Sequence, residues 1–247
     1  MIICRKITYE GMILRTITMS SNDVLKKSIR KNALILALFA MASTALVSIV
    51  YQLTKEKIAS EVERVMNQQL NKLVASEKYD NSPTSDCIIV MNHSRINQVS
   101  VNKIHRMRKN NEPIALVFSS TAHDGYSGDI NLLIAFSHND QPHQNRPQQD
   151  RLLGIEILNH RETPGLGDKI DSNKSNWLQQ FENIELTNIS EKSWRVKKDG
   201  GDFDALTGAT ITPRATINAI YQTALYFENN KIELFDREAN CEVSLNN

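Results

Sequence analysis

Four small residues without an acid, a base or a metal ligand stand just before a predicted helix. The stretch reads DALTGATITPRA over residues 204–215. Thr212 can cap a helix, and Pro213 suits a first helical position. A helix N-terminus offers unpaired N–H groups and a positive dipole end, which suit a phosphate. The pattern therefore predicts either a phosphate site or a plain loop that enters a helix.

The residue types around this helix start fit a phosphate with a bulky group attached. Gly208 and Ala209 leave space, whereas Thr207 and Thr210 supply hydroxyl groups. Arg214 adds a positive charge in the first turn of the predicted helix. None of these residues is a catalytic acid or base, so the chemistry would reside in the bound group.

A second loop, HRETPGLGDKI over residues 160–170, offers ligand contacts of another kind. Its Pro-Gly pair sets a turn, and its last glycine permits close backbone approach. It supplies two polar side chains and one apolar side chain that could meet a ring: Glu162, Thr163 and Leu166. The alternative is a structural turn between a strand and a helix. Tyr126, within GYSGD, is likewise either a turn aromatic or a residue that packs on a ring.

Several common chemistries lack their motifs in this chain. The sequence contains no Cys-x-x-Cys, His-Glu-x-x-His or Gly-x-Ser-x-Gly, and no complete phosphate-binding glycine loop. The six histidines are scattered, and His138 and His143 fall in a polar loop without a ligand framework. We therefore predict no catalytic residue and no metal site.

Charge and composition argue against nucleic acid as a partner. The 247 residues carry a formal net charge of +1, and only 6% are aromatic. A nucleic-acid-binding domain would show a basic excess or aromatic side chains on which bases stack.

One apolar segment, ALILALFAMASTALVSIVYQL at residues 33–53, contains no charged residue. A helix needs about 20 apolar residues to cross a bilayer, whereas a cleaved signal peptide has a shorter apolar run. Four basic residues precede the segment, and two lysines with one glutamate follow it. By the positive-inside rule residues 1–32 are cytoplasmic and the remainder is exported, into the periplasm of a Gram-negative cell.

The exported part is expected to be a single α+β domain. Residues 54–79 have helical spacing and form either a stalk or a helix packed on the domain. Residues 80–247 contain apolar runs typical of strands, such as PIALVFSSTA and INLLIAFS, then a polar loop at 138–150 and a C-terminal helix. Cys87 and Cys241 lie where oxidation is permitted, and we predict that they form a disulfide, the alternative being two free thiols.

At this point the sequence resembles a known family. HRETPGLGDKI followed by WRVKKDGGDFDALTGATITPRA is similar to the G subunit of Rnf-type ion-translocating electron transport complexes. The C subunit of the sodium-pumping NADH:quinone reductase has the same type of flavin-binding domain. The resemblance covers the anchor helix and nearly all of the exported domain.

The resemblance implies one covalently held FMN per chain. In this family a flavin transferase moves FMN from FAD onto the last threonine of an Asp-x-x-Ser/Thr-Gly-Ala-Thr motif. That residue is Thr210 here, and the rest of the motif is Asp204, Thr207, Gly208 and Ala209. Further flavin contacts are implied for Glu162, Thr163, Gly165, Leu166 and Gly167, with Tyr126 as an additional candidate.

The resemblance further implies an electron-relay subunit without a substrate site of its own. Its partners would be the other subunits of an inner-membrane complex that couples electron flow to ion movement. Two alternatives stay open. The chain could be a non-redox scaffold anchored in the membrane, or an exported domain that binds FMN reversibly.

Overall fold

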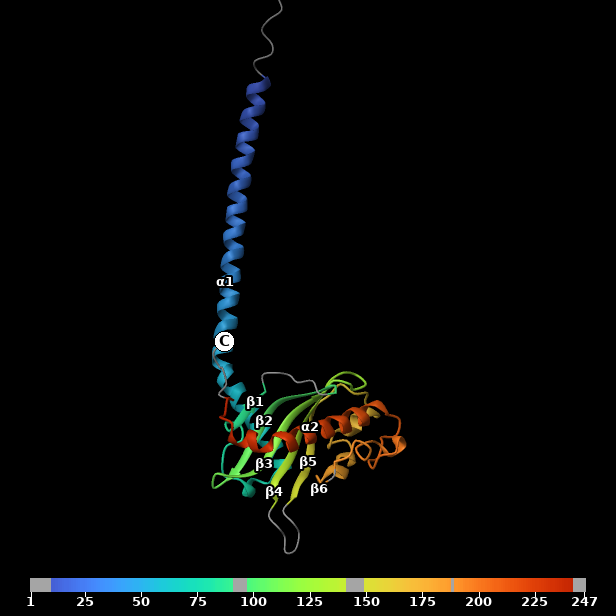
Figure 1. Ribbon diagram of the computed structural model, residues 1–247. Coiled ribbons are helices and arrows are strands. Elements are labelled where there is room, and N and C mark those ends of the chain that lie inside the picture. Colours follow the sequence, from blue (N-terminus) through green and yellow to red (C-terminus); the bar gives the residue numbers. More distant parts are fainter. Residues whose placement is uncertain (1–9, 91–96, 141–148, 188, 242–247) are drawn as a thin grey trace, which may run out of the picture. The chain divides into compact units, whose positions relative to one another are not determined.

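The computed structural model describes residues 10–90, 97–140, 149–187 and 189–241 (Figure 1). The chain divides into two compact units, residues 1–61 and 62–247. The first unit contains most of helix α1 (Glu10–Leu73), and the second contains the end of α1 and everything that follows.

Helix α1 includes the predicted apolar span. Within the described residues, Leu25–Leu73 is the one helical segment long and apolar enough to cross a membrane, with a mean hydropathy of 2.4 over 18 residues. Every side chain of residues 33–53 is exposed, including Phe39 at 72% and Leu53 at 76%. An exposed apolar helix of this length is compatible with a single-pass membrane anchor.

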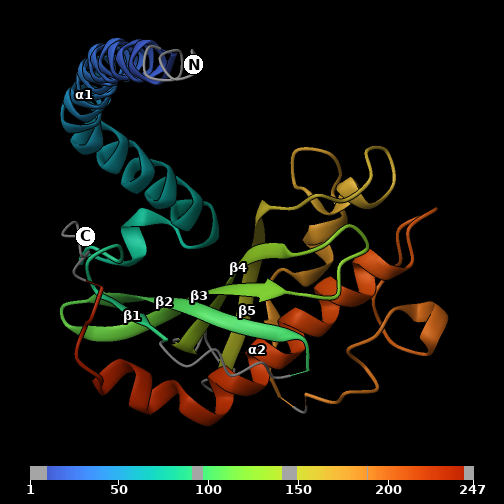
Figure 2. The ribbon, with the colours of Figure 1, turned by 90° about the horizontal axis from the view of Figure 1, so that it is seen from above.

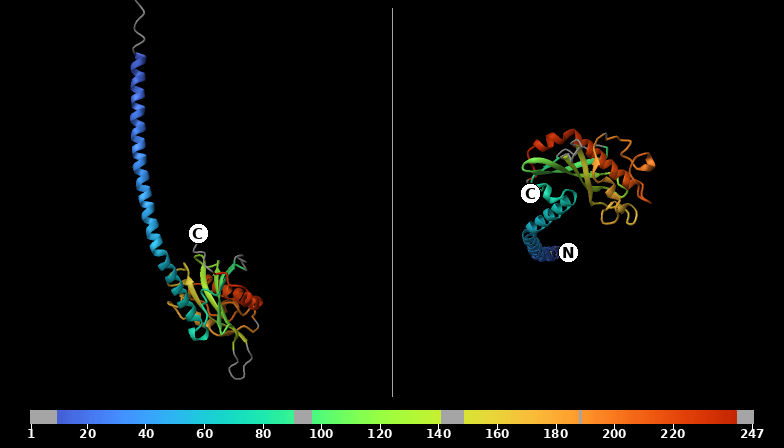
Figure 3. Two further views of the ribbon diagram at one scale, coloured as in Figure 1. Left: turned by 90° about the vertical axis from the view of Figure 1, so that its left-hand side faces the viewer. Right: turned by 90° about the horizontal axis from the view of Figure 1, so that it is seen from below.

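The second unit is built on a six-stranded antiparallel sheet in which each strand pairs with its neighbours in sequence. The strands are β1 (Cys87–Ile89), β2 (Val99–Lys109), β3 (Glu112–Ala122), β4 (Ile130–Asp140), β5 (Gln149–Asn159) and β6 (Ile184–Glu185). Helix α2 (Ile211–Asp236) lies along one face of the sheet, and the end of α1 lies on the other (Figures 2 and 3). This arrangement confirms the α+β fold class.

Two-sided burial explains why the strands read as unbroken apolar runs. Successive residues of a strand point to opposite faces, so a strand covered on both sides needs apolar residues throughout. On β3, Leu116 and Phe118 belong to the core beneath α2, whereas Val117 between them belongs to the core beneath α1. On β4, Leu132 and Leu133 divide in the same way.

The last turns of α1 pack directly on the sheet. Leu70 is fully buried against Met107, Val117 and Leu133. The Lys72 ammonium lies 2.5 Å from the carboxylate of buried Glu156 on β5. The sequence left open whether the region after the span is a stalk or a helix packed on the domain. The end of α1 is packed on the domain.

Helix α2 begins slightly before the predicted position. Thr210 occupies the N-cap position and Ile211 is the first helical residue. Capping by Thr212 was therefore a wrong expectation, because this buried hydroxyl lies inside the first turn and donates a hydrogen bond to Glu162. The buried residues of α2 include Ile217, Ile220 and Phe227, which face the sheet as an amphipathic helix requires.

Strand β2 lies within residues 87–138, whose composition favours strands, although its HRMRK stretch carries three basic residues. Three other segments differ from the sequence interpretation. SNKSNWLQQFEN at residues 172–183 has the cap and apolar spacing of a short helix, but only a 3-10 helix forms there, η3 (Trp177–Phe181). SWRV at residues 193–196 suggests a strand end, and there Val196 forms an isolated bridge to Phe203. The polar loop 138–150 is shorter than expected, because β4 continues to Asp140 and β5 begins at Gln149. Its centre, with His143, lies outside the described residues.

The segment after α2 is fastened to the first strand. Cys241 forms the predicted disulfide with Cys87, with Cα atoms 5.4 Å apart. The Asn240 amide donates to the Cys87 carbonyl oxygen at 3.1 Å, and its side-chain oxygen accepts from the Ile89 amide at 2.6 Å. The free edge of β1 is thus covered, which removes an exposed row of backbone groups.

Buried Arg106 on β2 ties the same region to the end of α2. Its guanidinium donates to the Leu234 carbonyl oxygen at 3.3 Å and to that of Phe235 at 3.2 Å. The Asp86 carboxylate balances its charge at 2.5 Å. The last carbonyl groups of a helix lack partners within the helix, so a buried arginine at this end satisfies them.

The stability of the domain should fall in mild acid because of His105 on β2. Burial lowers the pKa of this fully buried ring from 6.5 to about 4, although Nδ1–H donates to the Pro83 carbonyl oxygen at 2.8 Å. Between these two pH values the unfolded chain binds a proton that the folded chain does not. The free energy of unfolding therefore decreases as the pH falls through this window, by up to about 3 kcal/mol from His105.

This prediction is tested by denaturant unfolding at pH 7.5 and pH 5 of the wild type and His105→Gln. Glutamine can still donate to the Pro83 oxygen, but it does not titrate. We expect a smaller difference between the two pH values in the variant. An equal difference would show that other groups carry the acid sensitivity.

Candidate functional site

Both predicted loops border one cavity of about 340 Å³ at the N-terminal end of α2. This volume lies near the lower end of the range of about 300–1,000 Å³ that is typical of small-molecule sites. Three segments far apart in sequence line it: Tyr126, then Glu162, Thr163, Leu166 and Gly167, then Gly208, Ala209, Thr210, Ile211 and Thr212. The loops between β5 and α2 gather around this end of the helix (Figure 2).

Thr210 stands at the edge of the cavity with a free hydroxyl group. It is exposed, and its side chain makes no capping hydrogen bond to the helix. As the N-cap residue it lies beside the unpaired N–H groups of the first turn of α2. A phosphate attached to this hydroxyl would therefore meet N–H donors and the positive end of the helix dipole.

Gly208 allows the chain to turn into this position. Its φ is +84°, a left-handed conformation that glycine adopts at little cost. A Cβ atom there would also lie 2.8 Å from Cδ2 of Leu166. The two loops predicted from sequence thus touch at Gly208 and Leu166.

Glu162 joins all three segments of the cavity. Its side chain is buried, with a residue exposure of 4%. Oε1 accepts a hydrogen bond from the Ser127 amide at 2.9 Å, and Oε2 accepts one from the Thr212 hydroxyl. Gly167 lies against this pair, because a Cβ there would be 2.7 Å from Oγ1 of Thr212 and 2.9 Å from Oε2 of Glu162.

The loop after β5 turns as its Pro-Gly pair predicts. Gly165 has a φ of +77°, and the Leu166 amide donates to the Thr163 carbonyl oxygen at 3.2 Å. The Leu166 side chain remains 42% exposed. The turn thus holds an apolar side chain over the cavity.

The turn between β3 and β4 carries Tyr126, which is 66% exposed. A hydrogen-bonded chain braces this turn: the Ser100 hydroxyl lies 2.9 Å from Nε2 of His123, and Nδ1 of His123 lies 3.0 Å from the Asp129 carboxylate. These residue types also form hydrolytic triads, but Ser100 is only 2% exposed and cannot reach a substrate. The arrangement therefore serves to hold the turn.

Asp204 and Thr207, which the motif also contains, do not line the cavity. Asp204 is held by its surroundings. The Trp177 indole N–H donates to its carbonyl oxygen at 2.7 Å, and its amide donates to the Gln180 side chain at 2.7 Å. Its carboxylate pairs with Lys197 at 2.7 Å. Thr207 is exposed in the turn that precedes Gly208.

Arg214 is directed away from the expected phosphate position. Its guanidinium forms two hydrogen bonds with the Asp199 carboxylate, at 2.6 and 2.7 Å, and both residues line a different cavity. The hydrogen bond from Arg214 lowers the pKa of the Asp199 carboxyl. The contribution of Arg214 to a phosphate site, expected from its place in the first turn, is thus not realised.

The exposed apolar side chains of the domain favour a flat ring as the ligand. Within the described part of residues 80–241, the exposed large apolar side chains are Ile89, Tyr126, Leu166, Ile211 and Ile232. Three of them, Tyr126, Leu166 and Ile211, line this one cavity. A ring that filled the cavity would remove them from water, and a phosphate would fit the polar edge at Thr210. These residues therefore fit FMN.

Metal-ligating side chains do not gather anywhere in the described residues, where no group of three or more His, Cys, Asp or Glu could hold an ion. His138 lies on β4, with its ring 5.3 Å from that of Phe235 and Nδ1 3.6 Å from the Asp150 carboxylate.

Comparison with known proteins agrees with the geometry. Residues 125–224 match the family model of the FMN-binding domain, which covers the whole cavity. Residues 19–73 match the model of the RnfG N-terminal region, which corresponds to most of α1.

Several relatives match this chain over nearly their whole length. A protein of Pseudoalteromonas atlantica, named as the G subunit of the ion-translocating oxidoreductase complex, is 39% identical over 90% of this chain and 98% of its own length. Relatives with the same name occur in Shewanella loihica, at 39% identity over 89% of this chain and 99% of the relative, and in Yersinia pestis, at 40% over 82% and 91%.

The chain is thus a protein with a long apolar helix followed in sequence by an FMN-binding domain. Its sequence identity to these relatives, over nearly their whole length, identifies the family. The chain belongs to the family of G subunits of the ion-translocating oxidoreductase complex, the Rnf complex.

Gly208 and Gly200 offer a matched pair of variants for the contact between the loops. Their φ values are +84° and +83°, but a Cβ at Gly200 would meet no atom within 4 Å. Alanine at either position costs about 1 kcal/mol for the left-handed backbone. Only Gly208→Ala also pushes against Leu166.

We therefore expect Gly208→Ala to be more destabilising than Gly200→Ala in denaturant unfolding, and to reduce the FMN content of the purified protein. Gly200→Ala should retain its FMN. Equal FMN contents in the two variants would show that the contact between Gly208 and Leu166 does not shape the site.

Proposed function

We propose that this chain is an electron-relay subunit that carries one FMN covalently on Thr210. The observation that supports it most directly is the position of the Thr210 hydroxyl. It is exposed and free of a capping bond, and it borders a cavity with an apolar wall and a helix N-terminus.

The proposed attachment is a phosphoryl transfer from FAD, performed by a separate flavin transferase. The Thr210 oxygen forms a bond to the phosphorus on the riboflavin side of the pyrophosphate. The bond between this phosphorus and the bridging oxygen breaks, and AMP leaves. The hydroxyl proton passes to solvent. The product is a phosphoester, and no electron is exchanged.

Once attached, FMN supplies the electron-transfer chemistry, and the protein binds, orients and shields it. The N–H groups at the start of α2 would face the phosphate. Leu166, Ile211 and Tyr126 would cover the ring system, and Glu162 holds the three walls of the cavity together. A covalent link prevents loss of FMN from an exported domain, which has no cytoplasmic pool to draw on.

Thr210→Ala should abolish covalent FMN, whereas Thr210→Ser should retain it because serine keeps the hydroxyl. Each protein is produced with the flavin transferase and denatured, and its mass and in-gel flavin fluorescence are measured. Fluorescence that persists in denatured Thr210→Ala would refute the attachment site.

The same measurement separates the alternative functions. A wild-type chain that lacks flavin before and after denaturation would support a non-redox scaffold. Flavin that is present in the native protein but released on denaturation would support reversible binding.

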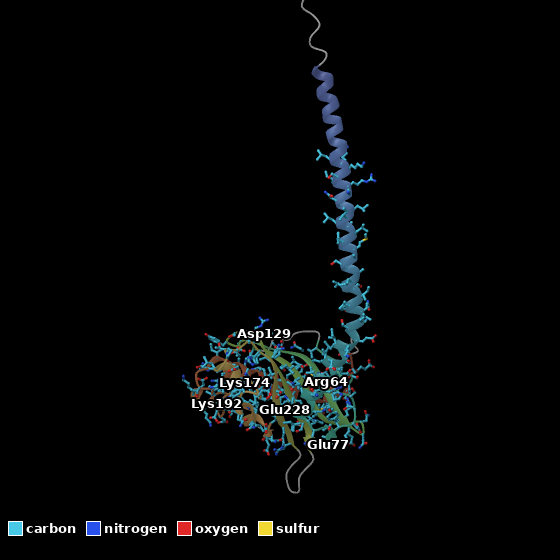
Figure 4. The ribbon with its side chains drawn as sticks, turned by 180° about the vertical axis from the view of Figure 1, so that it is seen from behind. Arg64, Glu77, Asp129, Lys174, Lys192 and Glu228 are labelled. Carbon is cyan, nitrogen blue, oxygen red and sulfur yellow. A yellow bond between two sulfur atoms is a disulfide. The ribbon has the colours of Figure 1, made fainter. Side chains whose placement is uncertain are left out.

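We further propose that the chain relays electrons between other subunits of the complex and does not itself oxidise NADH. The relatives are named as subunits of an ion-translocating oxidoreductase complex, which implies further subunits as partners. The sequence contains no complete nucleotide-binding glycine motif. Charged side chains of both signs cover the domain, as the labelled Asp129, Lys174, Lys192 and Glu228 illustrate (Figure 4).

We infer that the FMN-binding domain faces the periplasm and that the N-terminus is cytoplasmic. Lys26, Lys27, Arg30 and Lys31 precede the span, which favours a cytoplasmic N-terminus. The disulfide between Cys87 and Cys241 favours an oxidising compartment for the domain.

This topology is tested in a Cys4→Ser background, in which the other two cysteines are paired, with one cysteine added at an exposed lysine: Lys27→Cys before the span or Lys192→Cys on the domain (Figure 4). A membrane-impermeant maleimide should label Lys192→Cys in intact spheroplasts and Lys27→Cys only after lysis. The reverse pattern would invert the proposed topology.

A further inference from the structure

We propose that Glu162 sets the reduction potential of the bound cofactor, because its buried negative charge disfavours the addition of electrons in the cavity. The inference rests on the proposed function, since it requires FMN in this cavity. It assigns to Glu162 an electrostatic role in addition to its structural contacts.

The first step of the argument is the state of the side chain. Glu162 is 4% exposed, and both carboxylate oxygens accept hydrogen bonds, one from the Ser127 amide and one from the Thr212 hydroxyl. Hydrogen bonds donated to a carboxylate stabilise its charged form. The cavity wall therefore contains a buried carboxylate group that is held by two donors and shielded from bulk water.

The second step is the lack of a compensating cation. Among the described residues no ion pair to Glu162 is found, and Arg161, its neighbour in the chain, is exposed to solvent. Two basic side chains of the segments around the start of α2 are engaged elsewhere. Lys197 pairs with Asp204 at 2.7 Å, and Arg214 pairs with Asp199 at 2.6 Å. The start of α2 offers about half a positive charge, which offsets only part of one carboxylate.

The third step is the consequence for electron transfer. Reduction with two electrons and one proton from solvent would add one net negative charge close to Glu162, which lines the same cavity. Repulsion between like charges across a partly buried site is substantial, because the effective dielectric constant is far below that of water. The carboxylate thus makes the cofactor harder to reduce and a stronger electron donor once reduced.

Glu162→Gln isolates the charge from the packing. The side chain has the same shape, its oxygen can accept from the Ser127 amide, and its NH₂ group can donate to the Thr212 oxygen. Glu162→Ala also removes the charge, together with both hydrogen bonds of the carboxylate. Glu162→Asp retains the charge. Glu156→Gln is the matched control, because Glu156 is equally buried, at 5%, but is paired with Lys72 and does not line the cavity.

The experiment is a reductive titration of each covalently loaded full-length protein in detergent, with dithionite as the electron source, buffer as the proton source and an indicator dye. FMN absorbance reports the ratio of reduced to oxidised cofactor. At a fixed potential we expect this ratio to rise on the order of tenfold or more in Glu162→Gln and Glu162→Ala. It should stay near the wild-type value in Glu162→Asp and Glu156→Gln.

The amount of covalently bound FMN is measured first, by fluorescence after denaturation. This measurement separates a failure of the proposed function from a failure of the role proposed for Glu162. A wild type without FMN would refute the proposed function. Loaded charge-removing variants with an unchanged or lower ratio would refute the role of Glu162. Folded charge-removing variants that take up no FMN would also overturn it, because the charge would then serve attachment.

Discussion

The site depends on one buried carboxylate that holds three distant pieces of chain in place. Glu162 accepts hydrogen bonds from Ser127, 35 residues before it, and from Thr212, 50 residues after it. Removing one partner of a buried hydrogen bond costs about 1–3 kcal/mol, and more when a charged group is left unpaired. The hairpin turn, the loop after β5 and the start of α2 are therefore coupled, so that a shift in one wall of the cavity is resisted by the other two.

The sheet supplies the rigid support for this coupling. Strands β3 and β4 are covered on both faces, by α2 and by the end of α1, and their side chains are buried in two layers. The turn that carries Tyr126 connects these two strands, and α2 starts at the cavity before it crosses the same sheet. Both sides of the cavity are thus attached to elements of one packed core. Loops that are anchored in this way can hold a site in a precise geometry.

Local features of the site could be read from the sequence, and long-range ones could not. The Pro-Gly turn at Gly165, the small residues before α2 and the amphipathic helix follow from local rules, and each is present. The partners of Glu162 and Arg214 were not predictable, because each contact joins segments that only the tertiary fold brings together. The helix cap was misplaced by two residues because Thr210 and Thr212 are equivalent by residue type, and a buried carboxylate decides between them. The bounds of β2 did not follow from the β-rich composition of residues 87–138, because the carboxylate and carbonyl oxygens that bind Arg106 come from elsewhere in the chain.

The bond between Cys87 and Cys241 also has a consequence for the order in which the protein matures. The two cysteines are 154 residues apart, so the segment around Cys241 can cover the edge of β1 only after almost the whole domain has been synthesised. By contrast, the segments that border the cavity, from Tyr126 to Thr212, are complete earlier. Closure of the sheet edge is therefore a late event in biogenesis. The cavity can thus form before the edge of the sheet is closed.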